Sequence, residues 1–113
     1  MEKTLTIDGR EVRFKATAGF LYRYRTYFGI EYYIDLAKIS VNAPENKSTA
    51  IEDYENIDTR VFERILWTYA KTADDTIPEI DKWLDGFEVF NAKGILNELT
   101  ELLEITNKSL VKN

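Results

Sequence analysis

The sequence contains neither cysteine nor histidine. Without cysteine there is no disulfide, thiolate nucleophile or thiolate zinc site, and without histidine the usual general base near neutral pH is missing. No stretch approaches the ~20 apolar residues that a bilayer-spanning helix needs, and no apolar run follows a basic start at the N-terminus. We therefore expect a cytoplasmic protein that is not an enzyme and that has no cofactor, no metal site and no membrane partner.

The balance of charge narrows the class of partner. The net charge of −5 disfavours broad attachment to nucleic acid or to anionic lipid, because both are polyanions. Hydrophobic residues make up 44% of the 113 residues, which is enough to form the core of one ordinary domain. The composition favours a single globular domain over residues 1–113 whose partners are proteins.

Residues 1–16 are predicted to form a β-hairpin. Apolar and polar residues alternate on both sides of Asp8-Gly9, the dipeptide that most readily forms a two-residue hairpin turn. That turn sets the register and places four apolar side chains on one face, Leu5, Ile7, Val12 and Phe14. An isolated hairpin is marginally stable, so this face must pack on helices or on another copy of the sheet.

The middle of the chain predicts two aromatic-rich helices over residues 17–39, followed by a flexible loop over residues 40–57. The first helix runs from Thr17 to Gly29 with an apolar stripe at helical spacing, Phe20, Leu21, Tyr24, Tyr27 and Phe28. The second is shorter and spans Glu31 to Ile39. Scattered Asn, Ser, Pro and acidic residues then indicate an exposed connection.

Residues 58–107 are predicted to be helical, and residues 108–113 to form a frayed tail. A helix beginning at Asp58 or Thr59 carries a buried stripe, and a short helix lies between Pro78 and Gly86. A last helix begins near Asn91. The fold class is therefore α+β, with an N-terminal β-hairpin followed by four to five helices and a predominantly α-helical content.

Two groups of residues have an alternative functional interpretation that we do not favour. Asp74, Asp75, Asp81 and Asp85 are acidic neighbours, but they lack the spacing of a calcium loop, so a metal-dependent enzyme is a minor alternative. Arg23 and Arg25 alternate with aromatic residues, as in some nucleic-acid surfaces. We expect those aromatics to face the core and the arginines to face solvent.

Aromatic residues are nevertheless concentrated between residues 20 and 33, more than one short stretch can bury. Tyr22, Tyr32 and Tyr33 are therefore candidates for partner binding, with burial by the chain's own helices as the equal alternative. Trp67 is a further candidate, because it shares one face of its predicted helix with Arg64 and Lys71, and this face lies opposite the apolar stripe. Its ring needs a cover, either from those side chains, the last helix or a partner.

The order of these motifs resembles that of the tail assembly chaperones of siphophages and prophages of Gram-positive bacteria. The resemblance rests on the start of the chain, its middle and its closing leucine-rich helix: Leu5 to Gly9, Phe14 to Thr17, Leu21 to Arg25, Phe62 to Asp74, Ile77 to Glu88 and Ile95 to Leu99. It covers nearly the whole chain in order. The closing helix departs from the family pattern, because Asn97 and aliphatic residues stand where a proline and a tryptophan are often found.

This resemblance implies a protein that binds the tape measure protein, keeps it soluble and helps recruit tail tube subunits during assembly. It also implies action in the host cytoplasm and absence from the mature virion. The alternative is a small adaptor or regulatory module with a different protein partner. Homo-oligomerisation is left open, because a hairpin has unpaired edges.

Overall fold

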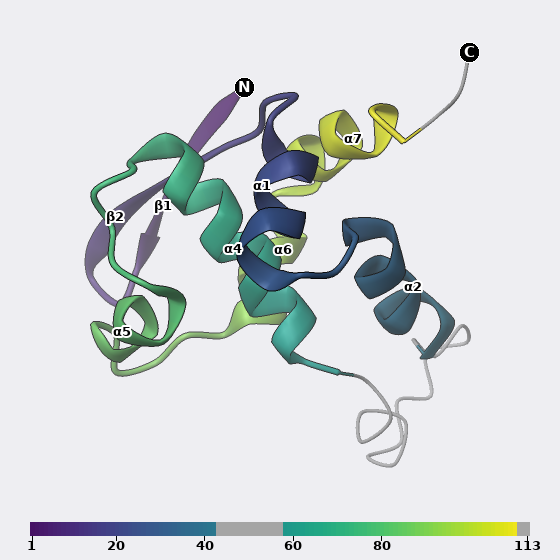
Figure 1. The fold of residues 1–113 in the computed structure, drawn as a ribbon. Coiled ribbons are helices and arrows are strands. Elements are labelled where there is room, and N and C mark those ends of the chain that lie inside the picture. Colours follow the sequence, from purple (N-terminus) through teal and green to yellow (C-terminus); the bar gives the residue numbers. More distant parts are fainter. Residues whose placement is uncertain (43–57, 111–113) are drawn as a thin grey trace.

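The computed structural model describes residues 1–42 and 58–110, and it combines an antiparallel hairpin with helices (Figure 1). The strands are β1 (Glu2–Ile7) and β2 (Arg10–Lys15), and the described helices are α1 (Phe20–Phe28), α2 (Tyr32–Asn42), α4 (Arg60–Ala73), α5 (Ile80–Asp85), α6 (Ala92–Asn97) and α7 (Thr100–Lys108). This confirms the predicted α+β class. The described residues hold six helices rather than four or five.

The hairpin has the predicted turn and register. Asp8 and Gly9 have φ angles of 54° and 80°, which two-residue turns of this kind require, and Ile7 lies opposite Arg10. The face that carries Ile7 and Phe14 is buried, whereas Thr4 and Thr6 on the other face are exposed. The buried face packs on α4.

Helix α4 is the centre of the fold, because it contacts β2, α1, α2 and α6 (Figure 1). Its buried residues form a wider band than the predicted stripe: Val61, Phe62, Ile65, Leu66, Trp67, Thr68, Tyr69 and Ala70. The buried Thr68 hydroxyl donates a hydrogen bond to the Arg64 carbonyl at 2.8 Å, so burial leaves no unpaired polar group there. Helices α1, α2 and α6 pack against this helix.

Several predicted boundaries need correction. Helix α1 begins at Phe20 rather than Thr17, because the Thr17 hydroxyl accepts a hydrogen bond from the Gly19 amide and holds a turn before the helix. Gly29 ends α1 as predicted, with a φ of 71°. Helix α2 continues through Asn42, so residues 40–42 are helical. The rest of the predicted loop, residues 43–57, lies outside the described residues.

The predicted last helix is two helices, α6 and α7. The amides of Glu98 and Leu99 donate to carbonyls three residues earlier, at 3.0 and 2.9 Å, and these tighter turns interrupt the helix. Leu99 is fully buried at the break. Asn91 caps α6 by accepting a hydrogen bond from the Gly94 amide at 3.2 Å. The predicted tail began at Lys108, but Lys108 is the last residue of α7, and residues 111–113 lie outside the described part of the chain.

Candidate partner-binding surface

Helix α1 presents two aromatic side chains to solvent. Tyr22, for which the sequence left exposure and burial as equal alternatives, is 67% exposed, and Tyr27 is 49% exposed. The exposure of Tyr27 corrects its assignment to the apolar stripe. The opposite face of α1 is buried through Phe20 and Tyr24. The guanidinium of Arg25 lies 5.8 Å from the centre of the Tyr22 ring, so a basic group borders this exposed ring.

Helix α2 exposes two adjacent large apolar side chains. Tyr33 is 55% exposed and Ile34 is 42% exposed, while Tyr32 and Asp35 on the other side of the helix are buried. Tyr33 was a predicted partner-binding residue, and Ile34 was not. We call the exposed side chains Tyr22, Tyr27, Tyr33 and Ile34 the α1–α2 surface.

Tyr32 is not part of this surface, which corrects its prediction as a partner-binding residue. It is 1% exposed, and its ring meets the Phe20 ring edge-on with 5.1 Å between centres. Its hydroxyl donates a hydrogen bond to Asn107 Oδ1 at 3.0 Å, which ties α2 to α7. Burial raises the pKa of Tyr32 to about 12. The chain's own helices therefore use this tyrosine, so it is not available to a partner.

Trp67 is also buried within the chain, with only 4% of its surface exposed. This corrects its prediction as a partner-binding residue. Part of its cover comes from α1, which the sequence did not suggest. The rings of Tyr27 and Phe28 pack edge-on against the indole, with centres 4.8 and 5.6 Å away. The indole Nε1 donates a hydrogen bond to the Pro78 carbonyl at 3.0 Å. Helix α1 thus closes over a tryptophan that the helical pattern had left exposed.

A buried carboxylate holds the two surface helices to α4. Asp35 on α2 is fully buried, and its Oδ2 accepts hydrogen bonds from the Tyr24 hydroxyl at 2.5 Å and from Arg64 Nη1 at 2.8 Å. Lys38 Nζ forms an ion pair with the other carboxylate oxygen at 3.1 Å. Burial by itself raises the pKa of Asp35, but these hydrogen bonds outweigh it and hold the pKa below its usual range. The carboxylate is therefore ionised at neutral pH and joins α1, α2 and α4.

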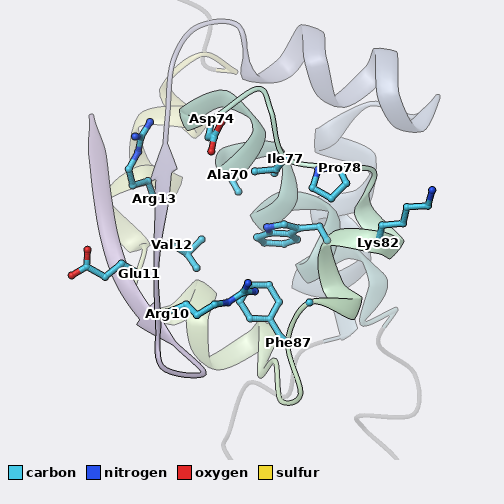
Figure 2. Close-up of a pocket in the computed structure, with 12 residues that line it drawn as sticks. Arg10, Glu11, Val12, Arg13, Ala70, Asp74, Ile77, Pro78, Lys82 and Phe87 are labelled. Carbon is cyan, nitrogen blue, oxygen red and sulfur yellow. The ribbon is translucent and has the colours of Figure 1, made fainter.

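A separate groove of about 360 Å³ lies beside β2, between the C-terminal end of α4 and α5 (Figure 2). Its walls include Arg10 and Val12 of the hairpin and Trp83 and Phe87 on the other side. Sequence reasoning missed this groove, because its two walls are about seventy residues apart in the chain and only the packing of α5 beside the hairpin brings them together. Asp8 holds them in place by accepting a hydrogen bond from the Glu88 amide at 2.9 Å.

The acidic residues after α4 do not converge. Asp74 Oδ1 accepts hydrogen bonds from the amide and hydroxyl of Thr76, at 3.0 and 2.6 Å, and these lower the pKa of Asp74. Within residues 1–42 and 58–110, no three carboxylates gather in a way that could hold a metal ion. No helix in the same part of the chain combines the length and apolar character of a membrane span.

Comparison of the chain with protein-family models, curated proteins and solved structures finds no match. The resemblance to tail assembly chaperones therefore remains a prediction from the motifs in the sequence.

Proposed function

We propose that this chain is a phage tail assembly chaperone, a binding protein rather than an enzyme. In this proposal it binds the tape measure protein in the host cytoplasm, keeps it soluble, helps recruit tail tube subunits and is absent from the mature virion. The order of motifs along nearly the whole chain supports the family. The α1–α2 surface supports a role in protein binding.

The exposed apolar side chains of α1 and α2 are the observation that carries the proposal. Tyr22 and Tyr33 are each more than half exposed, although they lie on helices whose other faces are fully buried. Tyrosine brings a large rigid contact area and one hydroxyl, which is why it is common at protein interfaces. A partner that covers these rings removes apolar surface from water without having to order a flexible loop.

The Asp35 network makes this surface a stable one. It connects α1 and α2 to α4 through Tyr24, Arg64 and Lys38, so both helices are anchored before a partner arrives. Anchoring reduces the conformational entropy that binding would otherwise cost. The net charge of −5 would keep a complex with an apolar helical partner in solution.

Co-expression with the tape measure protein from the same genome tests the proposal. We expect the wild-type chain to raise the soluble fraction of the tape measure protein, and the double variant Tyr22→Ser/Tyr33→Ser to lose most of this effect. Val89→Ser is the matched control, because Val89 is 70% exposed and belongs to the segment between α5 and α6, not to α1 or α2. Circular dichroism would verify that all variants stay folded.

The outcomes separate the chaperone from the adaptor. If the wild-type chain leaves tape measure solubility unchanged, the chaperone proposal is wrong. If the chain instead captures a different protein from host cells, and Tyr22→Ser/Tyr33→Ser abolishes that capture, the α1–α2 surface serves an adaptor. Equal activity of the double variant and the Val89→Ser control would exclude the α1–α2 surface from binding.

A further inference from the structure

The groove beside β2 has an apolar centre that water still reaches. Val12 points from β2 into this space, and Ile77 and Pro78 lie on the opposite side (Figure 2). Val12 and Ile77 are half-buried and Pro78 is exposed, while Trp83 of α5 is buried in the same lining. Apolar groups of this kind stabilise a complex when a partner removes them from water.

A guanidinium lies at the end of the groove that is nearer the hairpin turn. Arg10 points from β2 toward Phe87, and its guanidinium lies 4.3 Å from the centre of that ring (Figure 2). A Cβ at Gly86 would come within 3.2 Å of Arg10 Nη2, so the glycine leaves room for the guanidinium. Stacking on a ring holds a guanidinium in place without using its N–H groups, which stay free to donate.

The other cations of the groove lining are used elsewhere or point elsewhere. Arg13 forms an ion pair with Glu2 at 3.3 Å and donates a hydrogen bond to the Ala73 carbonyl. Lys82 points away from the groove (Figure 2). No carboxylate of the described residues forms an ion pair with Arg10. Arg10 is therefore the cation that this groove presents to a ligand.

The acidic residues of the lining do not neutralise Arg10. Glu11 points away from the groove, and Asp74 lies at the end opposite Arg10 (Figure 2). The Asp74 carboxylate accepts hydrogen bonds from Thr76. An unpaired guanidinium beside apolar groups complements a carboxylate from outside the chain, and Asp74 would repel that carboxylate from the other end. Charge therefore also sets the direction in which a ligand lies in the groove.

We propose that this groove binds an acidic segment of another polypeptide. The segment places one large apolar side chain against Val12 and Trp83 and one Asp or Glu carboxylate on the Arg10 guanidinium. A volume of about 360 Å³ is near the lower end of the range for binding pockets, so the groove admits side chains of a short segment. This goes beyond the proposed function, because none of the lining residues belongs to α1 or α2.

Selection from a displayed library of random peptides tests the proposal without assuming a sequence. The folded wild-type chain should enrich peptides of about ten residues that combine a large apolar residue with an Asp or Glu. A selected peptide in which the matching amide replaces its acid should bind ~tenfold more weakly in fluorescence anisotropy. Arg10→Gln should bind the acidic and the amide peptide equally, because the contact that distinguishes them is gone.

Matched variants locate the contact. Lys82→Gln makes the same change in net charge as Arg10→Gln at a lining residue that points away from the groove, so it should keep the preference for the acidic peptide. Bound peptide should change the fluorescence of Trp83, and Trp83→Phe should remove this change. The double variant Tyr22→Ser/Tyr33→Ser should bind the peptide like the wild-type chain. Circular dichroism would verify that every variant stays folded.

Several results would overturn the proposal. One is that selection enriches no peptides, or peptides without an excess of acidic residues. Another is that Arg10→Gln and Lys82→Gln weaken binding equally, which would indicate general attraction between charges. Loss of peptide binding in Tyr22→Ser/Tyr33→Ser would place the site on the α1–α2 surface, and a wild-type dimer that Arg10→Gln dissociates would make the occupant a second copy of this chain. Failure of these peptide tests leaves the solubility assay unaffected, so the two proposals are judged separately.

Discussion

Replacing Asp35 tests whether the buried carboxylate anchors α1 and α2 to the core. The fully buried carboxylate accepts hydrogen bonds from the Tyr24 hydroxyl at 2.5 Å and from Arg64 Nη1 at 2.8 Å. It also forms an ion pair with Lys38 Nζ at 3.1 Å. Asp35→Asn keeps the shape of the side chain and removes its charge. Asp35→Ala also removes both acceptor oxygens and leaves the Tyr24 hydroxyl without its partner.

The two variants should differ in magnitude. Breaking a buried ion pair by removing one partner costs about 3–5 kcal/mol, and we expect Asp35→Ala to fall in this range. The side chains of Arg64 and Lys38 are 21% and 40% exposed, so water can partly solvate both cations once the negative charge is gone. An amide can still accept one hydrogen bond. We therefore expect Asp35→Asn to cost about 2–3 kcal/mol.

Urea unfolding monitored by circular dichroism measures these losses. Because the pKa of Asp35 in the folded chain lies below its ordinary value of 3.8, its contribution is fully present above that pH. The contribution is lost as the pH falls through the folded-state pKa. The stability difference between the wild-type chain and Asp35→Asn should therefore be constant near neutrality and shrink in acid. Asp58 and Asp74 also have lowered pKa values, but they are present in both proteins and cancel.

Asp85→Asn is the matched control, because it makes the same chemical change at an exposed position on α5. It should alter the free energy of unfolding by no more than about 0.5 kcal/mol. A cost below about 1 kcal/mol for both Asp35 variants would refute the reasoning. So would a difference between wild type and Asp35→Asn that persists unchanged at the lowest pH at which both proteins fold.

Two further substitutions test the packing of α1. Gly29→Ala should destabilise the chain by about 1 kcal/mol in urea unfolding, because its φ of 71° disfavours a side chain although a Cβ there meets nothing within 4 Å. Gly29→Asn should cost less, and equal stability of the alanine variant would contradict the conformational explanation. Tyr27→Ala should cost about 1 kcal/mol and increase acrylamide quenching of Trp67 in a Trp83→Phe background, because it removes the ring that lies 4.8 Å from the indole. Unchanged quenching would mean that Phe28 alone covers Trp67.

Local chemistry made parts of the fold predictable. Asp8-Gly9 and the alternation around it specify the hairpin turn and its register, because the two-residue loop leaves one pairing. Gly29 specifies the end of α1, since it takes a positive φ at little cost. The excess of aromatic residues in one short stretch indicated only that some of them could remain exposed, and the structure exposes Tyr22 and Tyr33 while burying Tyr32.

The errors share a physical cause, which is that the neighbour of a helix face cannot be read from that helix alone. The side of α2 that carries Asp35 faces the core, because Tyr24 on α1 and Arg64 on α4 donate hydrogen bonds to the Asp35 carboxylate. Ile34, the residue before it, is therefore exposed. Trp67 lies on a polar helix line, yet α1 covers it. Neither pairing has a signal in the spacing of residues along one helix.

The amino-acid sequence by itself determined the class of fold, the hairpin register and several helix limits, because these depend on backbone preferences and on contacts between near neighbours in the chain. Tertiary structure alone decided which aromatic residues remain exposed, that a buried carboxylate joins three helices, and that a groove opens beside β2. Those features depend on contacts between residues far apart in sequence, and burial of a side chain is a property of its neighbours as much as of the residue itself.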